Sequence, residues 1–354
     1  MSDFLYREIF LGGAPKSGTT LLLGLLESHP DLLVFPEEVA LFNRAVLRSG
    51  EHDPRALAEH ILHHTEVRRL SEKGAPAARP GESENQVDYS FFNYPAFEKN
   101  FLARVDAFSS ASQNVSVPRH VLQSLFHAYA ETLEPPRDHP RLLVEKTPAN
   151  DYFAPWLFRL FPDAKLVQVV RDPRAVYASR RQRLLHDSPS HSKAFRLVNE
   201  WNRSVSQRFT YKNSSARFLS VRYEDLVRDP RSVVEQVCAF IGVDATPLPL
   251  TPTRGGRAWG GNSSYGENFS GISQSSLDRW KTQLTPGEIH WIEYHCQGGM
   301  KDCGYEILSD LSSPARNLAR WFARVPHEST LGYLKARRAS LCWHLAPRYI
   351  MRPH

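Results

Sequence analysis

The chain of 354 residues is 41% hydrophobic and 23% charged, which is ordinary for a globular protein with a sizeable core in one or two domains. Its net charge of +6 is uneven, because eight basic residues accompany one acid from Leu311 onward and leave the rest of the chain close to neutral. The body is therefore not expected to bind nucleic acid, and four cysteines without a Cys-x-x-Cys pair fit a reducing, cytoplasmic compartment.

The first half of the chain begins with a strand and a helix. Residues 7–13 predict a short buried strand that ends in glycines, and residues 19–30 predict an apolar helix closed by Pro30. A second helix, with charged flanks, is expected at residues 54–70. Residues 71–86 have no apolar periodicity, so we expect them to form an exposed loop.

Strands and helices continue to alternate in the second half of the chain. Strands are expected at residues 141–148, 164–170 and 216–222, and the second of these runs straight into a helix. Another helix is expected at residues 231–243. This alternation predicts crossover units, and therefore an α/β fold with a mainly parallel sheet, flanked by helices like a P-loop protein.

We expect one domain, residues 1–310, followed by a basic and helical tail at residues 311–354. Within the domain, residues 251–276 are rich in Gly, Ser and Asn, which predicts a long loop. The tail interleaves arginines with aromatic and leucine side chains. It is either an interfacial helix that holds the protein at the inner face of a membrane, or a helical pair that packs its aromatic side chains on the domain.

The sequence Gly-Ala-Pro-Lys-Ser-Gly-Thr-Thr connects the first predicted strand to the first helix. Backbone N–H groups at a helix N-terminus bind anions, and the Ser17 hydroxyl adds a donor. Gly13 and Gly18 have the spacing of a nucleotide-hydrolase phosphate loop, but Thr19 stands in the place of its lysine and Lys16 comes earlier. The alternatives are a glycine turn with a surface lysine and a kinase-like P-loop enzyme.

A second anion-binding pattern begins at Arg171, where a predicted strand ends. Pro173 suits the first turn of the helix that follows, and Ser179 lies about two turns along it. The forked guanidinium and the hydroxyl can converge on one phosphate. Taken alone, the same spacing also describes a solvated start of a helix.

Together, the two patterns resemble the cofactor site of sulfotransferases that use 3′-phosphoadenosine 5′-phosphosulfate (PAPS). The first loop resembles the one that holds the 5′-phosphosulfate, and the Arg–Ser pair resembles the one that holds the 3′-phosphate. The resemblance continues through Ser-Val-Arg-Tyr-Glu-Asp-Leu, whose tyrosine lies near the adenine in that family, and it fades near residue 307. It implies that the cofactor-binding residues are Pro15, Lys16, Ser17, Gly18, Thr19, Thr20, Arg171, Ser179, Tyr223 and Ser263.

The resemblance also implies in-line transfer of a sulfuryl group to an acceptor hydroxyl, with no metal required. Lys16 and Lys146 are the candidates for the cation beside the leaving oxygen. The histidine base of cytosolic small-molecule sulfotransferases is replaced here by Pro148. In the carbohydrate and tyrosyl-protein branches the base is a glutamate after the first helix. Motif matching selects Glu38, whereas an ungapped count from the loop selects Glu37.

The acceptor is expected to be a carbohydrate or a glycan-like molecule, with a protein tyrosine or a small-molecule hydroxyl as alternatives. A non-catalytic nucleotide-binding protein is a further alternative. His60 and His64 could face one metal ion from a helix, but no third ligand is evident, so we interpret them as a solvated face. Trp201 is expected to be part of the core.

Overall fold

Five parallel strands form the central sheet in the order β2-β3-β1-β4-β5. They are β1 (Arg7–Gly12), β2 (Leu32–Val34), β3 (Leu142–Lys146), β4 (Lys165–Val170) and β5 (Phe218–Arg222). The structure is a computed structural model that describes residues 6–50, 52–72, 87–107, 115–135, 140–185, 191–261 and 271–312, with the backbone alone at 182–185 and 191–193. A separate antiparallel hairpin consists of β6 (Thr253–Arg254) and β7 (Arg257–Ala258).

Helices connect the strands and cover the sheet. The α-helices of the described residues are α1 (Thr19–Leu26), α2 (Leu47–Ser49), α3 (Pro54–His64), α4 (Tyr94–Asp106), α5 (Val117–Thr132), α6 (Ala154–Leu160), α7 (Pro173–Leu185), α8 (His191–Tyr211), α9 (Tyr223–Arg228), α10 (Pro230–Ile241), α11 (Trp280–Gln283) and α12 (Pro286–Asp302). A π-helix, η1 (Leu41–Val46), and two 3-10 helices, η2 (Glu66–Ser71) and η3 (Pro148–Phe153), complete them. Within the described part of the chain, no helix is long and apolar enough to span a bilayer.

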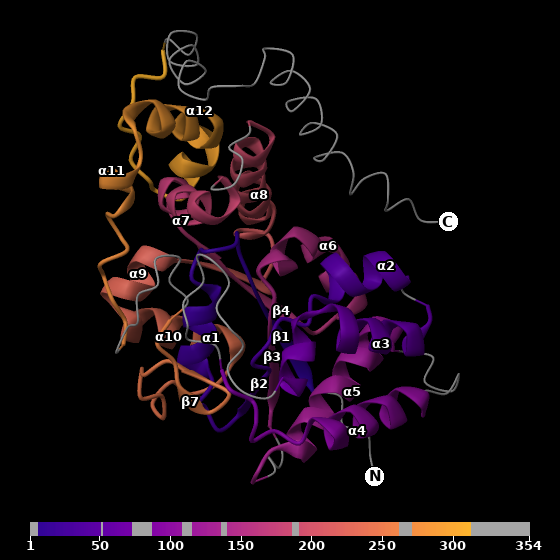
Figure 1. Cartoon of the computed structure of the whole chain (residues 1–354). Coiled ribbons are helices and arrows are strands. Elements are labelled where there is room, and N and C mark those ends of the chain that lie inside the picture. Colours follow the sequence, from indigo (N-terminus) through magenta and orange to yellow (C-terminus); the bar gives the residue numbers. More distant parts are fainter. Residues whose placement is uncertain are drawn as a thin grey trace.

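Alternate residues of the strands enter two different cores, because successive side chains of a strand point to opposite faces of the sheet. Phe10 of β1 packs with α3, α4 and α5 on one face, whereas Ile9 and Leu11 pack with α1 and α10 on the other. Figure 1 shows these two groups of helices on either side of the strands. A third cluster around Trp291 joins α7, α8 and α12. Both faces of the sheet are therefore covered, as is usual for a parallel sheet.

The parallel strands bring their carboxyl ends to one edge of the sheet, which is where ligands bind in open α/β folds. Leu11 is in register with Lys146, and Gly12 is in register with Gln168. The loop that follows β1 therefore starts between the ends of β3 and β4. The sequence places both of its anion-binding patterns at this edge.

The four predicted strands and the α/β class are confirmed, with some differences in detail. The structure adds β2, whose three residues are too few to show a strand period. The first helix ends at Leu26 rather than at Pro30. The helix expected at 54–70 stops at His64, because the Thr65 side chain accepts the N–H of Val67 and a 3-10 helix follows.

Several predicted features lie outside the described residues. They are most of the 71–86 loop, part of the 251–276 loop including Ser263, and the tail from residue 313 onward. The described start of the 251–276 loop contains the β6–β7 hairpin, which turns at two glycines with positive φ angles.

Candidate active site

The loop between β1 and α1 has a strained backbone that only some residues tolerate. Lys16 has a φ of 73°, and Gly13 and Gly18 have φ of 149° and 97°. A Cβ atom at Gly13 would lie 2.3 Å from the carbonyl oxygen of Val169, so the loop is pressed against β4. Gly18 is the N-cap of α1 and offers no capping side chain. The first N–H groups of α1 therefore have no side-chain acceptor, which suits an anion.

Ser17 is the most enclosed polar residue of this loop. The residue is 1% exposed, and its hydroxyl oxygen has no hydrogen-bond partner among the described residues. Thr19 is also buried, while Pro15, Lys16 and Thr20 are half-buried. A buried hydroxyl is rarely left without a partner. The Ser17 hydroxyl thus indicates a ligand that enters the loop.

Arg171 connects the loop to two other segments. Its Nη1 donates to the carbonyl oxygen of Lys16 at 3.0 Å, and its Nη2 donates to the carbonyl oxygen of Ser276 at 2.9 Å. The guanidinium lies 4.4 Å from the ring centroid of Tyr223. Its Nε is buried without a partner in the described part of the chain. The two anion-binding patterns of the sequence therefore lie side by side in the structure. The Nε of Arg171 could donate a hydrogen bond to a ligand.

Tyr223, at the start of α9, forms a wall beside the loop. A Cβ atom on Gly18 would lie 2.2 Å from Cδ2 of Tyr223, so only glycine fits at this position. The Tyr223 hydroxyl is 2.9 Å from Oγ of Ser276. The ring, the Arg171 guanidinium and the loop thus form one assembly at the carboxyl edge.

Two further predicted residues are buried in the structure. Ser179 of α7 is 8% exposed, as is Arg171. Trp201 is confirmed as a core residue at 1% exposure, and its Nε1 donates to the carbonyl oxygen of Arg171 at 2.8 Å. This bond fixes the backbone at the point where β4 turns into α7.

Glu38 and Lys146 form an ion pair at the same edge. Nζ of Lys146 donates to Oε1 of Glu38 at 2.7 Å, and the two side chains are 3% and 32% exposed, respectively. Burial acts to raise the pKa of the Glu38 carboxyl, but the adjacent Lys146 ammonium outweighs it, with help from Arg254 and Arg44. The net result is a lowered pKa. Glu38 is therefore ionised at neutral pH and can accept a proton.

Glu37 points into the protein instead. It is 2% exposed, and its two carboxylate oxygens have different partners. Oε1 accepts the Tyr89 hydroxyl at 2.8 Å, and Oε2 lies 2.7 Å from Nη2 of Arg254 on the β6–β7 hairpin. Burial and the nearby Glu37 carboxylate raise the pKa of Tyr89 well above its usual value. Glu37 thus fastens the hairpin and the Tyr89 segment to the turn that carries Glu38.

Comparison with known proteins agrees with this geometry. A model described as the sulfotransferase family matches residues 8–247. The chain belongs to the sulfotransferase family.

Individual sulfotransferases are similar over different lengths. Protein-tyrosine sulfotransferase 2 of Gallus gallus is 24% identical over 328 residues, which are 88% of this chain and 68% of that protein. Protein-tyrosine sulfotransferase 1 of Danio rerio is 24% identical, over 68% of this chain and 56% of its own length. Carbohydrate sulfotransferase 5 of Mus musculus is 30% identical over 166 residues, 41% of this chain and 42% of that protein. The matched stretches thus span only 42% to 68% of the length of these relatives.

A solved structure has the same fold. The sulfotransferase domain from the curacin biosynthetic pathway superposes with a TM-score of 0.53 and 24% identity, over 86% of this chain and 99% of that domain. This likeness concerns the fold of the sulfotransferase domain alone.

The donor of sulfotransferases, PAPS, fits the residues at the carboxyl edge. The Ser17 hydroxyl and the Arg171 Nε are buried donors that lack a protein partner among the described residues, and the start of α1 is uncapped. Such donors match the phosphate and sulfate oxygens of PAPS. Within the described segments, no group of three His, Cys, Asp or Glu side chains could hold a metal ion, although the rings of His60 and His64 are 4.8 Å apart. Independence from metal stays a prediction.

The sequence did not assign a role to Glu145, Thr147 or Arg254, which all contact the turn that carries the two candidate bases. Glu145 could have been noticed, because it is an acid inside the otherwise apolar strand Leu-Leu-Val-Glu. Arg254 gave no signal, since it comes from a polar loop far away in the chain. Its Nε donates to the carbonyl oxygen of Pro36 at 3.2 Å.

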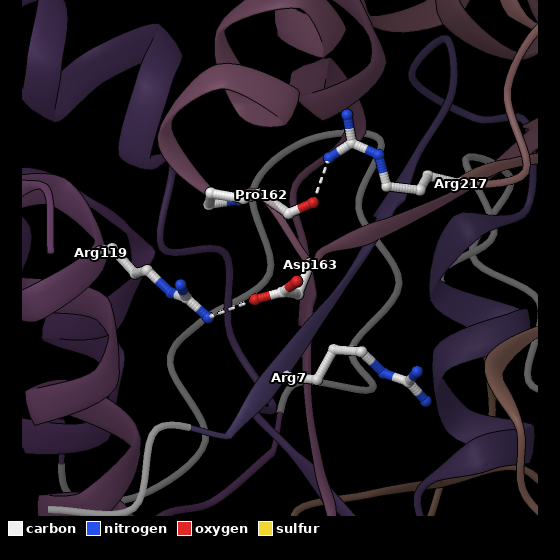
Figure 2. A pocket seen from close by; sticks show the side chains of 5 residues that line it. All are labelled: Arg7, Arg119, Pro162, Asp163 and Arg217. Carbon is white, nitrogen blue, oxygen red and sulfur yellow. Dashed lines mark hydrogen bonds and ion pairs between the residues drawn. The ribbon is translucent and has the colours of Figure 1, made fainter. Parts of the chain in front are cut away.

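An open hollow of about 510 Å³ lies at the opposite, amino edge of the sheet. Figure 2 shows the residues that line it, which are Arg7, Arg119, Pro162, Asp163 and Arg217. Each arginine is already engaged: Arg7 with the carbonyl oxygen of Ile241, Arg119 with Glu8 and Asp163, and Arg217 with the carbonyl oxygen of Pro162. We therefore assign this hollow no part in the reaction.

Proposed function

We propose that this sulfotransferase moves a sulfuryl group from PAPS to an acceptor hydroxyl, with Glu38 as the general base. The observation that carries the proposal is the difference between the two neighbouring glutamates. Glu38 is ionised and half-buried beside Lys146, whereas both oxygens of Glu37 are held by Tyr89 and Arg254. A general base needs an accessible, ionised oxygen, and this favours Glu38.

The proposed reaction is an in-line displacement at sulfur. PAPS supplies an activated sulfuryl group whose departure leaves a phosphate oxygen with negative charge. Glu38 takes the proton of the acceptor hydroxyl as the new oxygen–sulfur bond forms and the sulfur–oxygen bond to the nucleotide breaks. Protonation of Glu38 removes the negative partner of Lys146, so the ammonium becomes available to the leaving oxygen. Lys16 adds a second positive charge on the loop.

The other residues of the site are proposed to hold the donor. The hydroxyl groups of Ser17, Thr19 and Thr20 and the backbone N–H groups of Lys16 and Gly18 would surround the 5′-phosphosulfate, with Pro15 shaping the loop in front of them. Arg171 and Ser179 would bind the 3′-phosphate, and the Tyr223 ring would lie against the adenine. Ser263, outside the described residues, is proposed as a further donor to the sulfuryl group. These assignments are supported by the convergence of the loop, Arg171 and Tyr223.

For the acceptor we propose a carbohydrate or glycan-like hydroxyl, supported by the similarity to a mouse carbohydrate sulfotransferase. A protein tyrosine is the second candidate, because the Gallus gallus protein-tyrosine enzyme aligns over 88% of this chain. We further propose a cytoplasmic location, supported by the buried free thiols of Cys238, Cys296 and Cys303. Contact of the basic tail with anionic lipid remains a hypothesis, tested by liposome sedimentation with and without residues 312–354.

Two measurements test the proposed function. Thermal unfolding with PAPS or ATP should show stabilisation by PAPS, since a ligand that binds the native state raises its apparent stability. Stabilisation by ATP with magnesium instead would support the kinase-like alternative. Incubation with radiolabelled PAPS and a panel of oligosaccharides, tyrosine peptides and small phenols then identifies the acceptor. PAPS binding without transfer to any of these hydroxyls would contradict the proposed reaction.

A further inference from the structure

The turn that carries Glu38 is fastened to the end of β3 by two side chains that flank Lys146. Glu145 Oε1 accepts the backbone N–H of Val39 at 3.3 Å, and Thr147 Oγ1 accepts the N–H of Ala40 at 3.0 Å. The Thr147 hydroxyl donates in turn to Glu145 Oε1 at 2.6 Å. The two residues directly after the proposed base are thus held by the two residues on either side of its ion-pair partner.

The backbone of this turn needs such external partners. Ala40 has a left-handed conformation with φ of 52°, and it precedes η1, a π-helix. A left-handed alanine is an unfavourable conformation that persists only where its surroundings hold it, and π-helical turns are often found at functional sites. The N–H groups of Val39 and Ala40 come before the helix, so their acceptors must be supplied by side chains.

The same network reaches the strand that carries the cofactor loop. Nδ2 of Asn150, in η3, donates to Glu145 Oε2 at 2.5 Å and to the carbonyl oxygen of Leu11 at 3.1 Å. Glu145, Thr147 and Asn150 are all nearly inaccessible to solvent, at 1%, 2% and 1% exposure. Unlike the Ser17 hydroxyl, their polar side-chain atoms have protein partners in these bonds. These hydrogen bonds hold β1, β3 and the turn that carries Glu38 in fixed positions relative to one another.

We propose that Glu145 and Thr147 are positioning residues that set the Glu38 carboxylate relative to Lys146 and the donor loop. This inference rests on the proposed role of Glu38. Glu145 and Thr147 are thus expected to affect kcat rather than the affinity for PAPS, because neither side chain belongs to the loop proposed to hold PAPS. A displacement of the base by about 1 Å is enough to cost on the order of 10²-fold in rate.

The test compares variants at Thr147 with a matched buried threonine. Thr147→Val removes the hydroxyl at nearly constant shape, and Thr147→Ser keeps it. Thr65→Val is the control, because the Thr65 hydroxyl is also buried and also accepts a backbone N–H, from Val67 between α3 and η2. We expect Thr147→Val to lower kcat by roughly 10–10²-fold with KM for PAPS within about threefold. Thr147→Ser and Thr65→Val should stay close to the wild type in both constants.

A double-mutant cycle shows whether Thr147 acts through Glu38. In a Glu38→Gln background, Thr147→Val should cost less than about threefold, because residues that act as a unit are not additive. Radiolabelled PAPS and the best acceptor of the panel above are the substrates. Binding of the product 3′-phosphoadenosine 5′-phosphate (PAP), measured by calorimetry, establishes that each variant is folded. Glu145→Leu, which removes both acceptor oxygens at similar size, is the second variant if Thr147→Val does not bind PAP, with the same expected loss of kcat.

The outcomes separate this inference from the proposed function. An unchanged kcat in Thr147→Val, or a loss that is equally large in the Glu38→Gln background, overturns the positioning role and leaves Glu38 as the base. A fully active Glu38→Gln single variant overturns the proposed base itself, whatever Thr147 does.

Discussion

At the amino edge of the sheet, the buried carboxylate of Glu8 in β1 is matched by charged and polar donors. Arg119 donates to its two oxygens at 2.7 and 3.1 Å, and Gln123 donates at 2.6 Å. At the carboxyl edge, Glu145 of β3 is equally buried, but its hydrogen bonds come from the uncharged donors of Val39, Thr147 and Asn150. Burial, the largest effect, raises the pKa of Glu145 to about 7.

Arg217 and Arg171, one at each edge, differ in the same way. Arg217 at the amino edge donates to the carbonyl oxygens of Phe158, Phe161 and Pro162. Arg171 at the carboxyl edge keeps its buried Nε without a partner among the described residues, as does the Ser17 hydroxyl. Buried polar groups that are incompletely matched lower stability, and they concentrate where a ligand completes them. Nε of Arg7 at the amino edge is also buried without a partner among the described residues, but at the carboxyl edge two such donors lie on or beside the same loop. This arrangement suits an anion at the carboxyl edge.

The largest effect is expected from the proposed base at the carboxyl edge. Glu38→Gln removes the proton acceptor at constant shape, so turnover should fall by roughly 10²–10⁴-fold while PAP affinity stays nearly intact. Steady-state kinetics and calorimetry check the two parts. Glu37→Gln is the matched control, and its main effect should be on stability, since Glu37 holds Arg254 and Tyr89. If Glu37→Gln loses most of its turnover and Glu38→Gln does not, the general base is Glu37 rather than Glu38.

The second effect concerns the cost of the Glu145 charge. Its folded pKa of about 7 exceeds the ordinary value of 4.5, so the folded state binds the proton more tightly than the unfolded state. Stability from this group is therefore present below pH 4.5 and is lost as pH rises through about 7. Glu145→Gln does not ionise, so it does not lose stability in this way as pH rises. Its free energy of unfolding, relative to the wild type, should rise by up to about 3 kcal/mol between pH 4.5 and 8.

Urea denaturation of both proteins across this pH range measures the difference, and contributions from other titrating groups largely cancel in it. If the difference in free energy of unfolding between the two proteins does not change with pH, the pKa of Glu145 is not raised by folding.

Local sequence patterns predict part of the carboxyl edge. They indicate where an anion would bind, but they do not identify the general base. The loop with Lys16 and the strand end at Arg171 have short-range signatures, so two anion-binding patterns could be recognised from the sequence, and the structure brings them together. Their role in binding the cofactor stays a prediction. The choice between Glu37 and Glu38 could not, because it depends on Arg254 and Tyr89, which reach the turn from distant segments. β2 has only three residues, too short for its period to be seen.

The third effect sharpens the role of Arg171. In Arg171→Ala, binding of PAP should weaken more than binding of adenosine 5′-phosphosulfate, which lacks the 3′-phosphate. The extra loss should be about 1.5–3 kcal/mol, the range for a hydrogen bond to a charged group. Titration calorimetry with both nucleotides measures it. Equal losses would mean that Arg171 only supports the loop through the carbonyl oxygens of Lys16 and Ser276.

The smallest effect on activity is expected at the amino edge. Arg217→Met keeps an apolar stem against Phe158, whose ring centroid lies 4.4 Å from the guanidinium, but removes the bonds to the carbonyl oxygens. Carbonyl oxygens that lose a charged donor lower stability, here by about 1–3 kcal/mol. PAP affinity and turnover should change by less than about twofold, because the hollow in Figure 2 is lined by residues at or near the amino ends of the strands, whereas the Ser17 loop follows the carboxyl end of β1. Chemical denaturation and PAP calorimetry on this one variant check both statements. A loss of PAP affinity comparable to that of Arg171→Ala would show that the amino edge takes part in donor binding, and the contrast between the two edges would not hold.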